Sequence, residues 1–328
     1  MLCNVAADLP TLPTALDNES CVEKGLCPIM PTKSSHQPRH IYYEVHGDLK
    51  ASQKIVLVMG MNFTCSAWAS QVQYFSKRKD HVVLVFDNRG TGNSNAGAIE
   101  AYRTSDMAQD TVTLLNWLGW NQDRSLHLFG MSLGGMIAQE LCLIVPKRFK
   151  SATFISTRCG SELDWPSKGA WEVLVKTSAK KANGDQGLDL YLNVLFPKEY
   201  METVVEQDTL LKSDLREKLR NCHRLPREQA PIPFMGHFYA ATMHHCPHPK
   251  LHRIAADLKP AKMLILTGGS DELIPTKRSL ELHKNLPGSE LVVLENAGHA
   301  LIFQLSEEVN TIMERAIVEG NQAFKLVP

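Results

Sequence analysis

The chain has 328 residues, of which 44% are hydrophobic and 21% charged, as in a globular protein with one large domain or two medium ones. Lysine plus arginine and aspartate plus glutamate both number 35, so the formal net charge is zero and no basic excess favours nucleic acid. No apolar run approaches the length of a transmembrane helix, and the N-terminus lacks the pattern of a secretory signal. We therefore expect a cytoplasmic protein without a transmembrane segment; the sequence carries no signal for its oligomeric state.

The eight cysteines are scattered along the chain without the regular spacing of a disulfide framework. In a chain of this length without a secretory signal, such cysteines are typical of reduced thiols. Cys21 and Cys27 leave one alternative open, a small disulfide loop in an oxidising compartment.

Residues 1–38 are rich in Pro, Ser, Thr and Asn and show no period, so we expect a partly irregular N-terminal extension. It could lie on the surface of the domain or close over a pocket. Regular structure is expected from Ile41 onward, beginning with a strand at 41–46. Two short runs then contain apolar residues throughout, at 55–59 and 82–86, as in strands buried on both faces of a sheet.

Strands and helices alternate in the next part of the chain. The pattern predicts a helix at 104–118, a strand at 126–129, a helix at 133–145 and a strand at 152–156. Such alternation predicts a mostly parallel sheet flanked by helices.

The alternation stops between residues 160 and 258, where only helical patterns occur. Helices are expected at 169–180, 188–196, 199–220 and 234–244. The α/β pattern resumes with strands at 263–267 and 290–294 and helices at 280–285 and 305–319. We therefore expect an α/β core formed by residues 39–159 and 259–328, with a helical cap inserted at 160–258.

Gly130-Met131-Ser132-Leu133-Gly134 lies between an apolar strand and a helix. In this context a G-x-S-x-G sequence forms a sharp turn that holds the serine in a strained backbone conformation, with its hydroxyl clear of the sheet. A side chain at either glycine would collide with the neighbouring strand or helix. The pattern therefore predicts that Ser132 is a nucleophile.

An active serine needs a base to take its proton and an acid to orient that base. The carboxyl ends of parallel strands meet at one edge of a sheet, so such groups are expected just after the later strands. Asp271 follows the strand at 263–267, and His299 follows the strand at 290–294. These positions predict a triad of Ser132, Asp271 and His299, with Asp164, after the strand that follows the elbow, as a rival acid.

Residues 40–320 resemble the α/β-hydrolase superfamily in four motifs that occur in the same order. They are the elbow, the glycine–aspartate–proline turn at 268–275, the pair Gly298-His299, and the turn at 87–94. The resemblance implies an α/β-hydrolase fold with a helical cap, most similar to small-molecule esterases and enol-lactonase-type members.

The resemblance also implies a role for each residue of the site. Ser132 would attack an acyl carbonyl, His299 would act as base and then acid, and Asp271 would orient His299. By analogy, the backbone amides of Met61 and Leu133 would form the oxyanion hole. The histidine that many members carry before the glycine of this loop is replaced by Met59, which should matter little because the donors are backbone amides.

We therefore expect hydrolysis of a small-molecule carboxylic ester or related acyl compound, without cofactor or metal. An acyltransferase, thioesterase or lipase would use the same triad, and a non-catalytic small-molecule receptor or scaffold could retain the same fold.

Each of three features of the sequence allows two interpretations. The aromatic residues of the insertion could line an acyl pocket or form the cap's own core; they are Trp165, Trp171, Phe196, Phe234 and Phe238. A histidine-rich tract invites a metal interpretation, but two prolines predict a loop there and favour solvated or packing histidines; it comprises His237, His244, His245, Cys246, His248 and His252. The glycines of the turn at 87–94 could suggest phosphate binding, but we interpret Asp87 and Arg89 as anchors of nearby loops.

Overall fold

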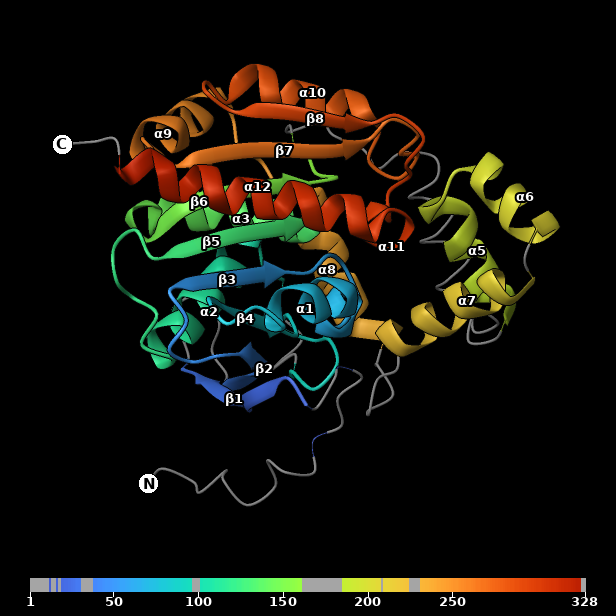
Figure 1. Ribbon diagram of the computed structural model, residues 1–328, viewed down its shortest axis with the longest axis horizontal. Coiled ribbons are helices and arrows are strands. Elements are labelled where there is room, and N and C mark those ends of the chain that lie inside the picture. Colours follow the sequence, from blue (N-terminus) through green and yellow to red (C-terminus); the bar gives the residue numbers. More distant parts are fainter. Residues whose placement is uncertain are drawn as a thin grey trace.

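The computed structural model contains one eight-stranded sheet between two layers of helices (Figure 1). It describes residues 19–30, 38–95, 101–160, 185–207, 209–223 and 231–325, together with positions 12 and 16. The strands are β1 (Cys21–Ile29), β2 (Arg39–Gly47), β3 (Gln53–Val58), β4 (His81–Phe86), β5 (Leu126–Met131), β6 (Phe149–Ile155), β7 (Lys262–Gly268) and β8 (Glu290–Leu294). The α-helices are α1 (Ala69–Ser76), α2 (Thr104–Trp117), α3 (Leu133–Ile144), α5 (Asp185–Leu195), α6 (Lys198–Gln207), α7 (Thr209–His223), α8 (Pro231–Thr242), α9 (His248–Leu258), α10 (Thr276–Asn285), α11 (Leu301–Gln304) and α12 (Ser306–Lys325).

The strands lie in the order β1-β2-β4-β3-β5-β6-β7-β8. β1 and β2 are antiparallel to their neighbours, whereas every pair from β4 to β8 is parallel. The predicted mostly parallel sheet is therefore confirmed. Because the parallel strands run in one direction, the loops that follow them gather at a single edge of the sheet.

Both faces of the central strands are buried, which explains their unbroken apolar sequences. Along β3, Val56 and Val58 belong to the core under α2, α3 and α9. Ile55 and Leu57 point to the opposite core, under α1 and α12. Figure 1 shows the two groups of helices on opposite faces of the sheet. This alternation is the period of a β-strand covered by helices on both sides.

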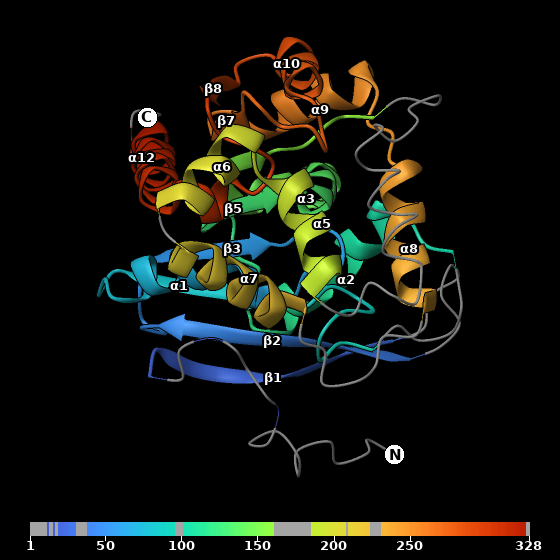
Figure 2. The ribbon, with the colours of Figure 1, turned by 90° about the vertical axis from the view of Figure 1, so that its right-hand side faces the viewer.

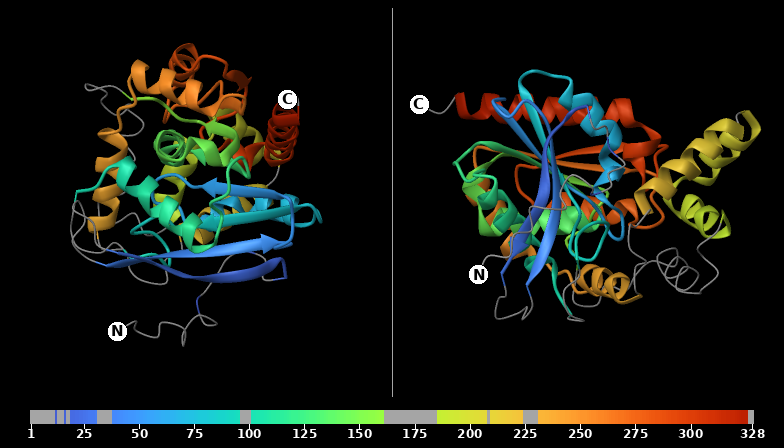
Figure 3. Two further views of the ribbon diagram at one scale, coloured as in Figure 1. Left: turned by 90° about the vertical axis from the view of Figure 1, so that its left-hand side faces the viewer. Right: turned by 90° about the horizontal axis from the view of Figure 1, so that it is seen from below.

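Regular structure begins earlier than Ile41, where the sequence led us to expect it. Cys21–Ile29 forms β1, which pairs with β2 at the edge of the sheet (Figure 3). Gly25 and Pro28 obscure its strand pattern, and proline is tolerated in an edge strand, where backbone donors on one side need no partner. Cys21 and Cys27 are both free thiols. They are six positions apart on an extended strand, about 20 Å, which is too far for a disulfide within β1.

The first three described helices between β6 and β7 form a group of their own. α5, α6 and α7 lie beyond the carboxyl edge of the parallel strands (Figures 1 and 2) and share a small core that includes Leu192, Phe196 and Leu219. The helix expected at 199–220 is two helices, α6 and α7, and the one expected at 169–180 lies outside the described residues. Among the described residues, no helix combines the length and apolar character needed to span a bilayer.

α9 replaces the loop that the prolines near the histidine-rich tract led us to expect. Pro247 is its N-cap residue, and Pro249 lies in its first turn. Proline is favoured at the start of a helix, because the first backbone N–H groups have no acceptor within the helix. Leu251 and Ile254 join the core of the sheet, so α9 packs beside α3 rather than over the strand ends.

His127 is a fully buried histidine in the middle of the sheet. Its Nδ1 lies 2.8 Å from Ser151 Oγ, and its Nε2 lies 3.1 Å from Gln53 Oε1. Burial, with smaller contributions from nearby cations, lowers the pKa of His127 to about 3. The folded protein therefore holds this imidazole neutral at pH values where an unfolded chain protonates it.

This difference predicts an acid-dependent loss of stability. A histidine of lowered pKa contributes fully above about pH 6.5, its ordinary value, and that contribution is lost as the pH falls toward the folded value. Relative to His127→Gln, the unfolding free energy of the wild type should therefore fall by about 1.4 kcal/mol per pH unit between pH 6 and 4. Urea unfolding at several pH values measures this slope. His252→Gln, at an exposed position of α9, is the control; parallel curves for the wild type and His127→Gln would contradict the prediction.

Candidate active site

Ser132 occupies the turn between β5 and α3 with a positive φ of 57° and a ψ of −120°. Few residues other than glycine adopt such a conformation, so the surrounding structure must hold it. The Ser132 amide donates a hydrogen bond to the Ile155 carbonyl at 2.8 Å. The Ser132 carbonyl accepts a hydrogen bond from Thr157 Oγ1 at 2.7 Å. The main chain of Ser132 is thus fixed by β6 and the residues just after it, independently of its side chain.

The two glycines of the elbow allow α3 to approach the sheet closely. A Cβ atom on Gly134 would lie 2.1 Å from the carbonyl oxygen of Val58, and one on Gly130 would lie 2.3 Å from the carbonyl oxygen of Gly134. Both obstacles are backbone atoms, which cannot move aside as a flexible side chain could. The steric requirement expected from the sequence is therefore present at both positions.

His299 and Asp271 form a buried pair at the ends of β8 and β7. His299 Nδ1 lies 2.8 Å from Asp271 Oδ2. The other carboxylate oxygen, Oδ1, accepts hydrogen bonds from the backbone amides of Leu273 and Ile274, both at 2.9 Å. The side chains of His299 and Asp271 are 4% and 0% exposed. With Oδ2 facing Nδ1, the imidazole is oriented so that Nε2 is left for other chemistry.

The predicted residues meet at one cavity at the carboxyl edge of the sheet. Ser132, His299 and Met61 all line it, and Asp271 lies behind His299. Leu133 is the buried first residue of α3. The rival acid, Asp164, lies outside the described residues.

The loop after β3 crosses directly over the serine. A Cβ atom on Gly60 would lie 3.1 Å from Ser132 Cβ and 3.6 Å from its Oγ. Two side chains hold this loop: Asn88 Nδ2 donates to the Met59 carbonyl at 2.8 Å, and His237 Nδ1 accepts from the Asn62 amide at 3.1 Å. Sequence reasoning missed both. Asn88 lies within the conspicuous turn at 87–94, but no local pattern indicated that His237 of α8 reaches the loop.

The turn at 87–94 anchors loops, as we interpreted it from the sequence. The Asp87 carboxylate accepts hydrogen bonds from the backbone amides of Cys65 at 2.7 Å and Asn93 at 2.8 Å. Burial raises the pKa of Asp87 to about 6 despite these hydrogen bonds, which lower it. Arg89 Nε donates to Asp110 Oδ2 at 2.6 Å, which ties the turn to α2.

The structure resolves part of both questions left open for the inserted helices. Phe238 of α8 lines the cavity, whereas Phe196 lies in the small core of α5 to α7. Trp165, Trp171 and the side chain of Phe234 lie outside the described residues. In the histidine-rich tract, His237 Nε2 donates to the Arg89 carbonyl at 2.8 Å, and His244 Nδ1 lies 2.9 Å from Thr104 Oγ1. His237 therefore docks α8 on the core, and His244 docks the segment that follows α8.

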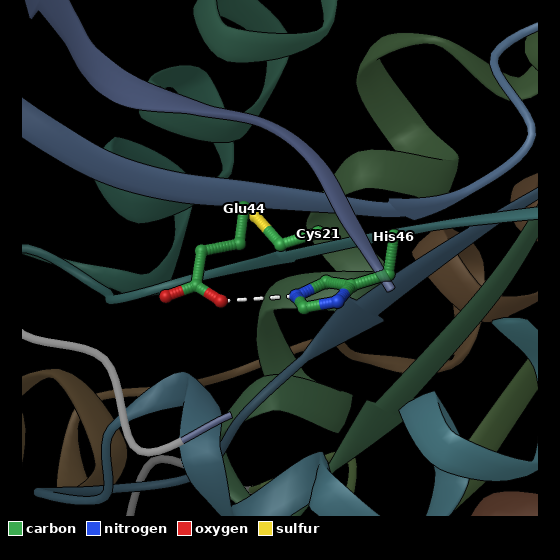
Figure 4. A group of neighbouring side chains, drawn as sticks. All are labelled: Cys21, Glu44 and His46. Carbon is green, nitrogen blue, oxygen red and sulfur yellow. Dashed lines mark hydrogen bonds and ion pairs between the residues drawn. The ribbon is translucent and has the colours of Figure 1, made fainter. Parts of the chain in front are cut away.

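Among the described residues, a group with metal-ligating side chains lies elsewhere, between β1 and β2. Figure 4 shows Cys21, Glu44 and His46, with the Glu44 carboxylate facing the His46 ring. His46 Nε2 lies 2.9 Å from Glu44 Oε2, and His46 Nδ1 lies 2.9 Å from Ser20 Oγ. The Tyr42 hydroxyl donates to the other Glu44 oxygen. Because both ring nitrogens and both carboxylate oxygens have partners, we interpret this group as a buried hydrogen-bond network that joins the two strands.

Comparison with known proteins agrees with this fold. Residues 54–304 match the α/β hydrolase fold family, so the chain belongs to that family. A protein of Stutzerimonas stutzeri strain A1501 assigned as the carbamate hydrolase RutD is 25% identical over 83% of this chain and 95% of its own length. Rhodomycin D methylesterase DnrP of Streptomyces peucetius is 27% identical over 85% of this chain and 95% of its own. A thermophilic esterase of Thermogutta terrifontis shares the fold with a TM-score of 0.70, at 18% identity, over 90% of this chain and 99% of its own.

The close approach at the elbow gives a prediction. Gly134→Ala should lower the unfolding free energy by about 1–3 kcal/mol and suppress covalent labelling of Ser132, because the added methyl group meets the β3 backbone. Gly119→Ala is the control: it adds a methyl group at a φ of 68°, which is unfavourable for alanine, but no atom lies within 4 Å of the added Cβ, whereas the helical Gly134 has only the steric clash. Urea unfolding and fluorophosphonate labelling give the two readouts. If Gly134→Ala resembled Gly119→Ala in both, the steric account of the elbow would be wrong.

Proposed function

We propose that this α/β hydrolase is a serine hydrolase that cleaves a carboxylic ester or related acyl compound through an acyl-enzyme on Ser132. The observation that carries the proposal is the buried His299–Asp271 pair, whose imidazole lines the same cavity as the strained Ser132. A nucleophile, a base and an acid that orients the base are what acyl transfer by serine requires.

In the proposed reaction, His299 Nε2 takes the proton of the Ser132 hydroxyl as Oγ attacks the acyl carbonyl. The backbone amides of Met61 and Leu133 stabilise the oxyanion, and one such donor is worth about 3 kcal/mol in the transition state. His299 then protonates the leaving alcohol as its bond to the acyl carbon breaks. Water, deprotonated by His299, attacks the acyl-enzyme and releases the acid, which regenerates Ser132.

The cavity favours an uncharged small-molecule substrate. Its lining is largely apolar, with Phe63, Met131 and Phe238 among its residues, and none of the described lining residues is Asp, Glu, Lys or Arg. A buried ion without a partner is strongly disfavoured, so a charged acyl group should bind poorly. The names of the relatives, a methylesterase and a carbamate hydrolase, favour an ester or a related acyl compound.

The inserted helices α5 to α8 are proposed as the cap of this site. Ala300, next to His299, donates its amide hydrogen to the Leu195 carbonyl of α5 at 3.0 Å, and His237 of α8 bonds the loop at Asn62. We also propose that the protein is cytoplasmic and that it belongs to the esterase or enol-lactonase-like branch of the family.

A fluorophosphonate probe tests whether Ser132 is a reactive nucleophile. The wild type should be labelled, and Ser132→Ala should not. Well-folded wild-type protein that fails to react would instead support the other class, a non-catalytic receptor or scaffold. Labelled protein that turns over thioesters, or transfers acyl groups to alcohols, faster than it hydrolyses esters would favour a thioesterase or acyltransferase.

Replacing the acid tests the assignment of Asp271. Asp271→Ala should reduce kcat on a p-nitrophenyl ester by about 10³–10⁴-fold, because His299 loses the group that fixes its orientation and stabilises its cation. Asp164→Ala should reduce kcat far less. Initial rates at saturating substrate compare the two, and a larger loss in Asp164→Ala would transfer the role of acid to that residue.

A further inference from the structure

Besides Ser132, His299 and the hydroxyl of Tyr191, the described lining of the apolar cavity includes a side-chain amide. It is Asn62, in the loop proposed to supply the oxyanion donor Met61. Its neighbours in the lining are mostly hydrophobic, including Met59, Phe63 and Phe303. An amide in such surroundings is the kind of group that sets the orientation of a bound ligand.

The side-chain amide of Asn62 is buried without a hydrogen-bond partner in the part of the chain that the structure describes. The residue is 6% exposed, and neither Nδ2 nor Oδ1 has a hydrogen-bond partner among the described residues. Buried polar side chains usually find partners within the fold, and an unpaired one costs stability. Both atoms are themselves almost fully buried, so a ligand would reach this donor and acceptor where the side chain turns toward the cavity that Asn62 lines.

The backbone of Asn62 is held by the rest of the structure. The φ of Asn62, 59°, lies in the left-handed region. The backbone N–H of Asn62 donates a hydrogen bond to Nδ1 of the fully buried His237. His237 Nε2 in turn donates to the Arg89 carbonyl, so the imidazole bridges the loop and the turn at 87–94. These contacts fix the backbone of Asn62, and with it the point from which the side chain extends.

We propose that the Asn62 amide is a substrate-binding group that hydrogen-bonds a second, uncharged polar group of the substrate. This group, a hydroxyl or ketone oxygen, lies within a few bonds of the scissile carbonyl. The inference rests on the proposed function and narrows its substrate class to neutral hydroxy- or oxo-substituted esters. The side-chain amide of Asn62 can donate to a substrate hydroxyl or ketone and can accept from a hydroxyl. A carboxylate on the substrate, by contrast, would be buried in a cavity whose described lining offers no Lys or Arg to pair with it.

Matched esters test the proposal in the full-length protein. One series varies the acyl chain, with the methyl esters of pentanoic, 3-hydroxypentanoic and 3-oxopentanoic acid. The other varies the alcohol, with butyl and 3-hydroxybutyl pentanoate. The wild type should prefer a polar member of at least one series over its plain partner by about tenfold or more in kcat/KM, because an unpaired buried amide penalises an analogue that lacks the polar group.

Asn62→Gly is the informative variant, because glycine accepts the left-handed backbone and removes the side chain that carries the amide. The preference should collapse toward a ratio of one. Asparagine is also favoured at left-handed positions for conformational reasons alone. Under that purely structural role, Asn62→Gly would keep the preference of the wild type, and this result would overturn the proposal. Equal kcat/KM within both series in the wild type would overturn it too.

Binding to inactive protein separates this inference from the proposed function. Calorimetric titration of Ser132→Ala with the same uncleaved esters should show the affinity ratio between polar and plain members, and Ser132→Ala/Asn62→Gly should lose it. If the wild type neither reacts with fluorophosphonate nor hydrolyses any ester, the proposed function fails, while the affinity ratio still decides the role of Asn62. If ester hydrolysis is present without the ratio, only the role of Asn62 is wrong.

Discussion

The close approach of α3 to the central strands is the constraint on which the site depends. Without side chains at 130 and 134, the first turn of the helix lies against the backbone of β3 and β5. The chain can make this connection only by placing Ser132 at a positive φ, and hydrogen bonds to β6 hold it there. The strain is local, while the buried parallel sheet that resists it is extensive. The same geometry brings the serine to the edge where the loops after β3, β7 and β8 converge.

The inserted helices complete this edge from two directions. α5 accepts a hydrogen bond from the backbone beside His299, and α8 supplies His237 to the loop at Asn62. A change in these helices would therefore alter both the walls of the cavity and the placement of groups proposed to act in catalysis. This coupling explains why His237 is fully buried although its helix belongs to the insertion.

Much of the core could be predicted from sequence, because its signals are local. Apolar runs such as 55–59 identify strands buried on both faces, and the positions of Asp271 and His299 follow from the rule that parallel strands end at one edge. β1 escaped prediction because an edge strand needs only one partner and tolerates Gly25 and Pro28. The roles of His237 and Asn62 also escaped it, since the hydrogen bond between them joins residues 175 positions apart and depends on tertiary packing.

The central claim is that Ser132 carries the acyl group during turnover. Rapid mixing with p-nitrophenyl acetate, acid quenching and mass spectrometry of the digested protein would test it directly. The account predicts an acetyl group on the peptide containing Ser132 within the first turnover, and no acetyl group on the corresponding peptide of Ser132→Ala. Turnover that proceeds with no adduct, or with the acetyl group on another residue, would contradict the account.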